Sequence, residues 1–286
     1  MKEHLSPREL ARAMGVSESS IKRWSDAGRI RMKRTAGGHR RIPAAEAVRF
    51  IRAQRHPVDD PAALGIEAVD LRDGLSDGDR LFKMLQRGES QSADDFVRTL
   101  FIGGMSIEQI VDGPFRNAFI RLGELWEVEG DAGIMWEHRA TQLGIGILQS
   151  LRTLIPEPIG PQPRAVGAAP ASDPYQLPSM AVQAALEGAG FEATNCGPDT
   201  PPASLAAAID ETRPLLVWIS STASALPLEP LEPVVRAAQQ VGAHIVIGGQ
   251  RGIDGANLPD RVSAMETLSE LTAFARGLAA QWRARQ

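Results

Sequence analysis

Beyond residue 164 the sequence alternates short apolar segments with segments of helical pattern, and this alternation constrains the fold more than any other feature. The segment PLLVWISST is apolar almost throughout and lies between the helical segments ASLAAAIDET and LEPVVRAAQQVG. Such runs are typical of strands buried on both faces, and parallel neighbours need a crossover helix between them. We therefore predict an α/β domain with a doubly wound parallel sheet over residues 164–286. The expected strands are residues 164–169, 191–197, 214–222 and 244–250.

The loop after the first expected strand has an unusual composition. It reads ASDPYQLPSM, and between Pro174 and Pro178 it contains Tyr175, the only tyrosine of the chain. In open α/β sheets, ligands bind outside the carboxyl ends of the strands, where such loops gather. We therefore expect this loop to contact a ligand.

The charges are distributed unevenly along the chain. Residues 1–56 contain 14 lysines and arginines against 5 acidic residues, a balance of +9, and the other residues carry −13 because the whole chain carries −4. A small basic segment attached to a larger acidic body indicates an anionic polymer as its partner, nucleic acid first of all. The alternative is a solvated basic surface without a partner.

Two short helices joined by a tight turn are predicted in the basic segment. Ser6, followed by Pro7 and Glu9, has the pattern of a capping box with proline at the first helical position. The segment GVS makes the turn, and Ser17 is placed to cap a second helix over residues 18–27. This is the helix-turn-helix arrangement, whose second helix enters the major groove of DNA. The side chains expected to face DNA are Ser19, Ser20, Lys22 and Arg23.

The next segment, RIRMKRTAGGHRRIP (residues 29–43), has the pattern of a β-hairpin with cations near its tip. Such a hairpin can lie along the DNA backbone as a wing, where each Lys or Arg contact with a phosphate releases counterions. A third helix is predicted from Pro43 onward. The phosphate contacts are expected from Arg34, His39, Arg40 and Arg41.

A helical region separates the basic segment from the α/β domain. Residues 56–65, HPVDDPAALG, are predicted to be a polar linker, and PEPIGPQP before the first strand is a second, stiffer one. Between them, four amphipathic helices with short connections indicate a bundle, whose alternative role is that of a plain dimerisation or spacer module. The expected helices are residues 79–88, 92–104, 106–130 and 131–155, with caps from Ser92 with Asp95 and from Ser106 with Gln109.

The basic segment resembles a known family. Residues 5–55 resemble the winged helix-turn-helix of MerR-family regulators, and TAGGHRRI is similar to the wing signature of that family. The resemblance implies a protein that dimerises and binds palindromic promoter sites on double-stranded DNA.

The rest of the chain, residues 76–286, resembles the cobalamin-binding unit of light-responsive MerR-type repressors of the CarH and LitR type. The similar motifs are GPDTP at 197–201, SST at 220–222, GGQ at 248–250, LW at 125–126 and EH at 137–138. In that family, the glycine pair lets a flat macrocycle lie close to the backbone, the serine loop surrounds the nucleotide tail, and the Trp and Glu-His residues cover the upper face. The cofactor contacts implied here are Trp126, Glu137, His138, Ser220, Thr222, Gly248 and Gly249.

One departure from the family changes the expected chemistry. The family reads Asp-x-His-x-x-Gly in the first loop, with the imidazole as the lower cobalt ligand, whereas Tyr175 and Pro178 occupy the histidine and glycine positions after Asp173. A neutral imidazole is a good donor to cobalt, whereas a phenol with a pKa of about 10 must first ionise. The absence of the family's cobalt-ligating histidine favours one of two hypotheses: the chain binds a different tetrapyrrole, or it binds cobalamin in an atypical mode.

Several interpretations of the ligand therefore stay open. Tyr175 either packs in a pocket that has lost its cofactor, or stacks on or ligates a bilin or a haem. Cys196 is a candidate for a covalent thioether to a bilin vinyl group, although a small buried residue at a strand end is the more frequent role of such a cysteine. A third possibility is a body without any ligand, controlled by a protein partner.

The sequence thus predicts a multi-domain protein: a winged helix-turn-helix over 1–56, a four-helix bundle over 76–155, and a cobalamin-binding-like α/β domain over 164–286. We expect a light- or ligand-responsive transcriptional regulator, a sensor or photoreceptor that binds promoter DNA as a homodimer or homotetramer. No catalytic or metal-binding motif is recognised, and a role as accessory to a corrinoid-dependent methyltransferase is disfavoured by the basic segment and the missing histidine. No apolar run approaches the ~20 residues of a membrane span, and one cysteine suits a reducing compartment, so a cytoplasmic location is expected.

Overall fold

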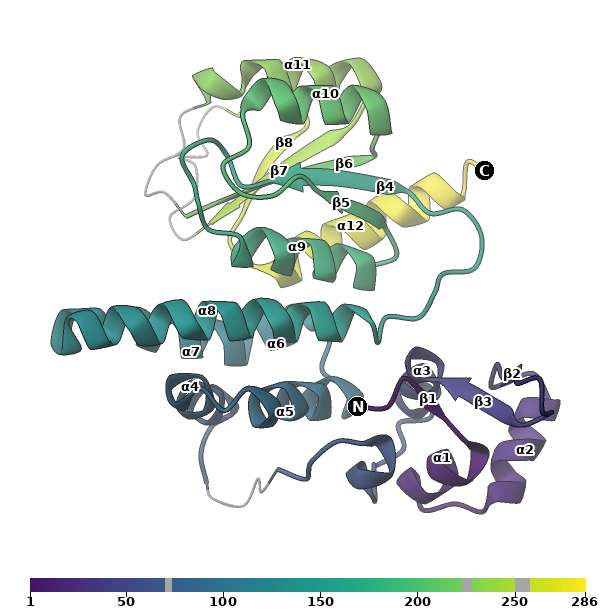
Figure 1. Cartoon of the computed structure of the whole chain (residues 1–286). Coiled ribbons are helices and arrows are strands. Elements are labelled where there is room, and N and C mark those ends of the chain that lie inside the picture. Colours follow the sequence, from purple (N-terminus) through teal and green to yellow (C-terminus); the bar gives the residue numbers. More distant parts are fainter. Residues whose placement is uncertain (70–73, 223–227, 250–257) are drawn as a thin grey trace. The chain divides into compact units, whose positions relative to one another are not determined.

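The computed structural model describes residues 1–69, 74–222, 228–249 and 258–286, with the backbone alone at Trp126 (Figure 1). Its contacts divide the chain into two compact units. Residues 1–106 and 113–157 form the first unit, and residues 107–112 and 158–286 form the second. The helix-turn-helix and most of the predicted bundle therefore belong to the first unit, and the parallel sheet belongs to the second.

The first unit begins with a small head in which three helices pack on a short antiparallel sheet. The strands follow the order β1-β3-β2, so both neighbours pair with the central strand. Ser6 caps the first helix in a complete capping box and Ser17 caps the second, as predicted. The elements are β1 (His4–Leu5), α1 (Pro7–Ala13), α2 (Glu18–Asp26), β2 (Lys33–Arg34), β3 (Arg40–Pro43) and α3 (Ala44–Gln54).

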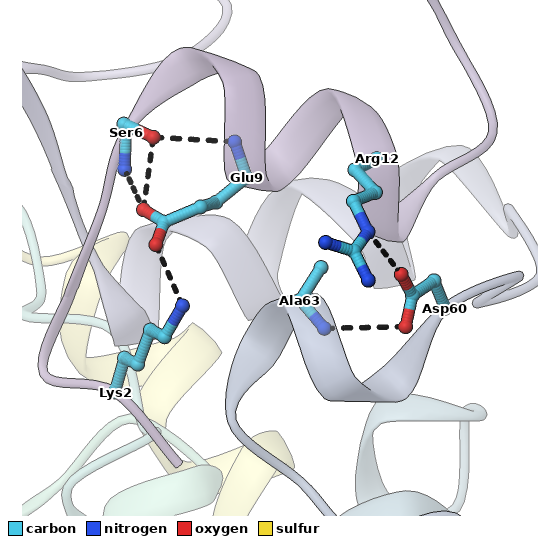
Figure 2. Close-up of polar contacts among 6 residues, drawn as sticks. All are labelled: Lys2, Ser6, Glu9, Arg12, Asp60 and Ala63. Atoms are coloured by element: carbon cyan, nitrogen blue, oxygen red, sulfur yellow. Dashed lines mark hydrogen bonds and ion pairs between the residues drawn. The ribbon is translucent and has the colours of Figure 1, made fainter.

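The segment that follows α3 is not the linker that the sequence predicted. Asp60 caps a short 3-10 helix, η1 (Pro61–Leu64), and the Leu64 side chain is fully buried. Figure 2 shows the Asp60 carboxylate bound to Arg12 of α1 and to the backbone of Ala63. The aspartate and proline that suggested a flexible connection instead begin a helix turn, because both residue types favour the first positions of helices. This segment is part of the head.

Four helices of the first unit form the predicted helical region. Ser76 caps α4, and Phe96 of α5 and Leu148 of α8 are fully buried between the helices. The cap predicted at Ser92 is wrong, because α5 already begins at Ser90 and Ser92 lies inside its first turn. The helices are α4 (Asp77–Arg87), α5 (Ser90–Ile102), α7 (Arg116–Glu129) and α8 (Asp131–Arg152).

The third predicted helix, over 106–130, is not continuous. A short helix, α6 (Ile107–Ile110), is followed by a π-helical turn, η2 (Val111–Phe115), that contains Pro114. A proline has no backbone N–H and clashes with the preceding turn, so a wider turn accommodates it where a regular helix would not. Asp112 in this turn accepts hydrogen bonds from the backbone N–H groups of Leu268 and Ser269, both at 2.9 Å, and this contact joins residues 107–112 to the second unit.

The second unit is built on a five-stranded parallel sheet of order β5-β4-β6-β7-β8. Figure 1 shows helices on both of its faces, so the predicted multi-domain fold class with a doubly wound sheet is confirmed. The edge strand β8 was not predicted, because it is short and only partly buried and lacks a continuous apolar run. The strands are β4 (Arg164–Ala168), β5 (Glu192–Asn195), β6 (Leu216–Ser221), β7 (His244–Gly249) and β8 (Val262–Met265).

Two hydrophobic cores stabilise the sheet, one on each face. The first lies under α10 and α11 and includes Val166, Val217 and Ile245. The second lies under α9 and α12 and includes Leu186, Trp218 and Val246. None of the helices among the described residues combines the length and apolar character that a membrane span requires. The covering helices are α9 (Leu177–Gly188), α10 (Pro202–Thr212), α11 (Glu232–Val241) and α12 (Leu268–Arg283), with a 3-10 turn, η3 (Glu229–Leu231), before α11.

Candidate nucleic-acid interface and ligand site

The predicted recognition helix, α2, presents polar side chains on one face and its apolar side chain to the head. Ile21 is fully buried, whereas Ser19, Lys22 and Arg23 are exposed and Ser20 is half-buried. The Ser17 hydroxyl accepts a hydrogen bond from the backbone N–H of Ser20 at 3.2 Å, and the two serine hydroxyls lie 3.0 Å apart, so the Ser20 side chain is turned toward the cap. Lys22 forms an ion pair with Glu18 one turn earlier at 2.7 Å. This pair is exposed and is easily exchanged for a phosphate contact, because surface ion pairs contribute little free energy.

The wing is a hairpin closed by backbone hydrogen bonds between Thr35, Gly38 and His39. The N–H of Thr35 donates to the carbonyl of His39 at 3.0 Å, and the N–H of Gly38 donates to that of Thr35 at 2.8 Å. Gly38 has φ +78°, a left-handed conformation that favours glycine at this turn. The side chains of Arg34, His39 and Arg41 are exposed, as a phosphate-binding role requires.

Arg40, the fourth predicted phosphate contact, has a different environment. Its guanidinium is 3.0 Å from the carboxylate of Asp26 at the end of α2, and only 27% of its side chain is exposed. Arg40 therefore connects the wing to the recognition helix. No local sequence pattern predicted this pair, because the two residues lie on different elements, 14 positions apart. An external phosphate must compete with Asp26 for this arginine.

A polar and aromatic cluster holds the recognition helix against α3. The rings of Trp24 and Phe50 lie 5.2 Å apart, and the Arg29 guanidinium stacks over both rings. Glu46 is buried, which opposes its ionisation. Hydrogen bonds from the Arg49 side chain and from the Arg31 backbone outweigh that burial, so that the pKa of Glu46 is lowered. An ionised glutamate thus fixes the segment that leads from α2 into the wing.

The carboxyl edge of the parallel sheet carries the second candidate site. The sheet order reverses between β4 and β6, and ligands of open α/β sheets bind at such a switch point. Asp173, after β4, is buried, and its Oδ2 atom accepts hydrogen bonds from the backbone N–H of Thr222 at 2.6 Å and from the Thr222 hydroxyl at 3.0 Å. The two loops that flank the switch point are therefore joined by Asp173. Sequence reasoning did not include this aspartate among the site residues, although it is the first residue of the loop motif.

The loop after β5 is attached to the same edge. The N–H of Asp199 donates to the carbonyl of Asp173 at 2.8 Å, and the Asp199 carboxylate accepts from the N–H of Ser172 at 2.7 Å. Ser172 and Asp199 both have positive φ angles, +69° and +49°. Such conformations are costly for non-glycine residues and persist where the surroundings hold them. The edge is therefore a preformed arrangement of three loops.

Tyr175 lies on the outer side of this arrangement. Its backbone N–H donates to Asp173 Oδ1 at 3.1 Å, and 53% of the residue is exposed. Pro178 stands in the first turn of α9, where a proline favours helix initiation. The two prolines thus stiffen a loop that presents a phenol to solvent above the sheet edge.

The glycine pair and the serine loop lie at the ends of β6 and β7. Ser220 is buried. A Cβ atom at Gly249 would overlap the carbonyl of Ser221, and one at Gly248 would lie 3.2 Å from the carbonyl of Met265. Packing of neighbouring strands therefore excludes a side chain at Gly249 without any macrocycle and leaves little room for one at Gly248.

Cys196 is exposed, whereas a cysteine at a strand end is more often buried. The residue lies directly after β5. Desolvation by neighbouring chain atoms nevertheless raises the pKa of its thiol. Because the thiolate is the reactive form, a raised pKa slows addition to a vinyl group at neutral pH.

The predicted upper-face residues belong to the first unit. The side chain of Trp126 is outside the described part of the structure. Glu137 of α8 accepts a hydrogen bond from Thr141 at 3.0 Å, and the neighbouring His138 has a side chain that is 76% exposed. Exposed apolar side chains gather on α7 and α8 of this unit. They are Ile120, Val128, Ile134 and Met135.

The residues of the second unit do not fit cobalamin held in the way that the resemblance implies. A phenol replaces the imidazole at Tyr175, and the interior beside β4 and β6 is filled by the indole of Trp218. What the described part of the sheet edge does offer is a set of hydrogen-bonded loops that includes the hydroxyl of Thr222 and the exposed Tyr175. Sequence reasoning missed Trp218, which is the only aromatic side chain of β6.

Comparisons with known proteins agree with the class that the fold defines. Residues 5–55 match a family described as helix-turn-helix domain. Together with the observed architecture, this match supports a protein with a DNA-binding helix-turn-helix head, a helical region and a doubly wound parallel sheet, as the sequence predicted. Within that class, the chain is similar to the HTH-type transcriptional repressor CarA of Myxococcus xanthus. The two are 27% identical over 271 residues, which cover 85% of each chain.

Solved structures that resemble part of this chain include the following two. The monomethylamine corrinoid protein of Methanosarcina barkeri is 14% identical, with a TM-score of 0.48, over 71% of this chain and 98% of that protein. A cobalamin-binding protein of Desulfitobacterium hafniense is 14% identical, with a TM-score of 0.34, over 70% of this chain and 97% of that protein.

Proposed function

We propose that this protein is a light- or ligand-responsive regulator of transcription, located in the cytoplasm, that binds a tetrapyrrole at the carboxyl edge of its parallel sheet. The observation that supports the proposal most is the joined pair of loops at the switch point, where Asp173 holds Thr222. This edge is preformed, and it lies where open α/β sheets bind their ligands. Ligand binding changes the oligomeric state of the protein, and the oligomeric state controls promoter binding.

The DNA contacts come from the head. Ser19, Lys22 and Arg23 read the major groove, with Ser20 supporting the helix, and the wing contacts phosphates. The target is palindromic double-stranded promoter DNA bound by a homodimer or homotetramer, because linking heads raises the effective concentration of the second head at its half-site. The phosphate contacts are assigned to Arg34, His39 and Arg41, with Arg40 joining them once Asp26 is displaced.

The domains that we propose to perform these roles are residues 1–56 for DNA binding, 76–155 for the helical cap and 164–286 for the ligand. The candidate ligand residues of the helical region are Trp126, Glu137 and His138, and those of the sheet domain are Tyr175 and the ends of β6 and β7. The β6 and β7 contacts are Ser220, Thr222, Gly248 and Gly249.

Absorption spectroscopy tests the ligand. The protein is expressed or reconstituted with biliverdin, haem and cobalamin in parallel, and each product is purified by gel filtration before its spectrum is recorded. A bilin gives a red band and haem a Soret band, and either band after gel filtration supports the proposal. Covalent attachment of a bilin is lost in C196S. A colourless protein under all three conditions contradicts the tetrapyrrole and favours control by a protein partner.

Control by a protein partner is the second candidate because of the exposed apolar side chains on α7 and α8. Val128 is 79% exposed and Met135 is 49% exposed. Exposed clusters of apolar side chains are typical of surfaces that a partner covers. A colourless protein whose promoter binding changes on V128K would support this candidate.

A further inference from the structure

Trp218 occupies the interior of the second unit between β6 and α9. Its side chain is 1% exposed, and it is the largest fully buried side chain of the described residues. The indole N–H donates a hydrogen bond to the hydroxyl of Ser179 in the first turn of α9 at 3.0 Å. The indole is therefore fixed in orientation as well as buried.

The polar chain that begins at Trp218 continues to the carboxyl edge of the sheet. The Ser179 hydroxyl donates to Oδ1 of Asn195 at 3.0 Å, and the same oxygen accepts from the backbone N–H of Gly197 at 3.0 Å. Gly197 begins the GPDTP loop after β5. Hydrogen bonds thus connect Gly197 at the carboxyl edge of the sheet, through Asn195 and Ser179, to the buried indole.

The neighbouring strand is adapted to the indole. Gly167 of β4 pairs with Trp218 of β6, and a Cβ atom at Gly167 would overlap the indole atoms Cγ and Cδ2. The indole therefore takes the space that a side chain on β4 would use. Leu186 of α9 and Val246 of β7 belong to the same buried cluster. Protein interiors are close-packed, so a second aromatic ring cannot enter beside Trp218.

We infer that Trp218 is a specificity-determining residue that closes the interior of the sheet to any ligand with an appended aromatic base. This inference rests on the proposed tetrapyrrole site and names its ligand class more narrowly. A flat macrocycle can rest on the edge near Asp173 and Thr222, whereas a nucleotide tail directed into the interior meets the indole. The site accordingly takes a tetrapyrrole without a nucleotide, such as a bilin or a haem.

A cavity experiment tests the filled interior without any tetrapyrrole. W218G removes the indole and leaves a space for one bicyclic aromatic ring, and an apolar cavity of this kind binds a matching small molecule. Benzimidazole at millimolar concentration should raise the Tm of W218G by several degrees and leave the wild type unchanged. S179A, which removes the hydrogen-bond partner but keeps the indole, is the matched control and should not respond.

If W218G is unfolded on its own, the same inference requires benzimidazole to restore its helical circular dichroism. Equal responses of W218G and the wild type, or no response of W218G, would overturn the inference.

A second experiment compares cobalamin with cobinamide, a corrinoid that lacks the nucleotide. The wild type should bind cobalamin no more tightly than cobinamide, whereas W218G, or W218L if a milder variant is needed, should favour cobalamin by tenfold or more. Tighter binding of cobalamin by the wild type, with a spectrum of the displaced base, contradicts the inference. If neither corrinoid, biliverdin nor haem binds, the tetrapyrrole proposal fails, and the benzimidazole experiment still decides whether Trp218 fills the interior.

Discussion

Asp173 and Thr222 join the loops on either side of the switch point of the sheet, with the carboxylate 2.6 Å from the backbone nitrogen of Thr222 and 3.0 Å from its hydroxyl. The carboxylate is buried, so these bonds replace its contacts with water. A buried charged acceptor without donors is costly. The loop conformation at the sheet edge therefore depends on this pair.

Replacing Asp173 by asparagine should destabilise the second unit. The amide has one acceptor fewer and places an N–H₂ group against a backbone donor, which costs about 1–3 kcal/mol. Urea denaturation should show this loss of unfolding free energy in D173N. T222V should lose less unfolding free energy, because the backbone N–H of residue 222 can still donate to Asp173. D210N, at an exposed position of α10, is the control. Equal stability of D173N and D210N would show that the pair contributes nothing.

Replacing Arg41 by alanine should weaken promoter binding evenly across sequences. Arg41 is exposed on the wing, and loss of one phosphate contact lowers the slope of log affinity against log salt by about 0.9. Fluorescence anisotropy at several salt concentrations measures this slope. R236A removes an exposed arginine from α11 and should bind as the wild type does. A change confined to one base position would contradict a backbone role.

The capping box of α1 should make the head sensitive to acid. The hydrogen bond from Lys2, together with those from Ser6, lowers the pKa of Glu9 from 4.5 to about 2 (Figure 2). Because the folded pKa is the lower one, the stabilisation is present above pH 4.5 and is lost as the pH falls toward 2. Hydrogen exchange of residues 1–30 between pH 5 and pH 2.5 should show this loss, and E9Q should remove most of the pH dependence.

S6A tests the same capping box at neutral pH. It should destabilise the head by about 1 kcal/mol, the usual contribution of a serine cap. An S6A head that is as stable as the wild type, or an E9Q head that keeps the full acid sensitivity, would assign the acid response to other groups.

Restoring a histidine in the first loop should not by itself restore tight cobalamin binding. In Y175H the imidazole becomes available, but Trp218 still fills the interior. The double variant Y175H/W218G should therefore gain far more affinity for cobalamin than the two single variants together. Absorption titrations of the four proteins measure this coupling, and tight binding by Y175H alone would show that the indole is no obstacle.

Local signals in the sequence predicted much of this fold. Ser6 and Ser17 cap their helices as expected, because a cap depends on residues within one turn. The apolar run around Val217 predicted a buried strand for the same reason. Secondary-structure prediction failed where the apolar pattern of an element is short, and contacts were missed where the two residues are distant in the chain. Strand β8 has no continuous apolar run, and the cap at Ser92 was misplaced because the N-cap of α5 is Glu89, which makes no side-chain capping hydrogen bond that a sequence pattern could reveal.

The candidate sites show the same limit. The loop around Tyr175 was recognised from its composition, but its attachment to Thr222 through Asp173 spans 49 residues. Trp218 was recognised as part of a strand, yet its effect depends on Gly167 on the neighbouring strand and Ser179 on a helix. Sequence patterns indicate which residues have reactive or bulky side chains. The pairing of strands and the packing of helices determine which residues those side chains contact.

The ion pair between Arg40 and Asp26 has a consequence for how selectively the head binds DNA. Asp26 acts as an internal competitor, so any polyanion must first displace a carboxylate to obtain this arginine. A random duplex that approaches the wing alone gains less from that exchange than a promoter whose groove also receives α2. Removing the carboxylate, as in D26N, would make the head bind all DNA more strongly and distinguish its promoter less well.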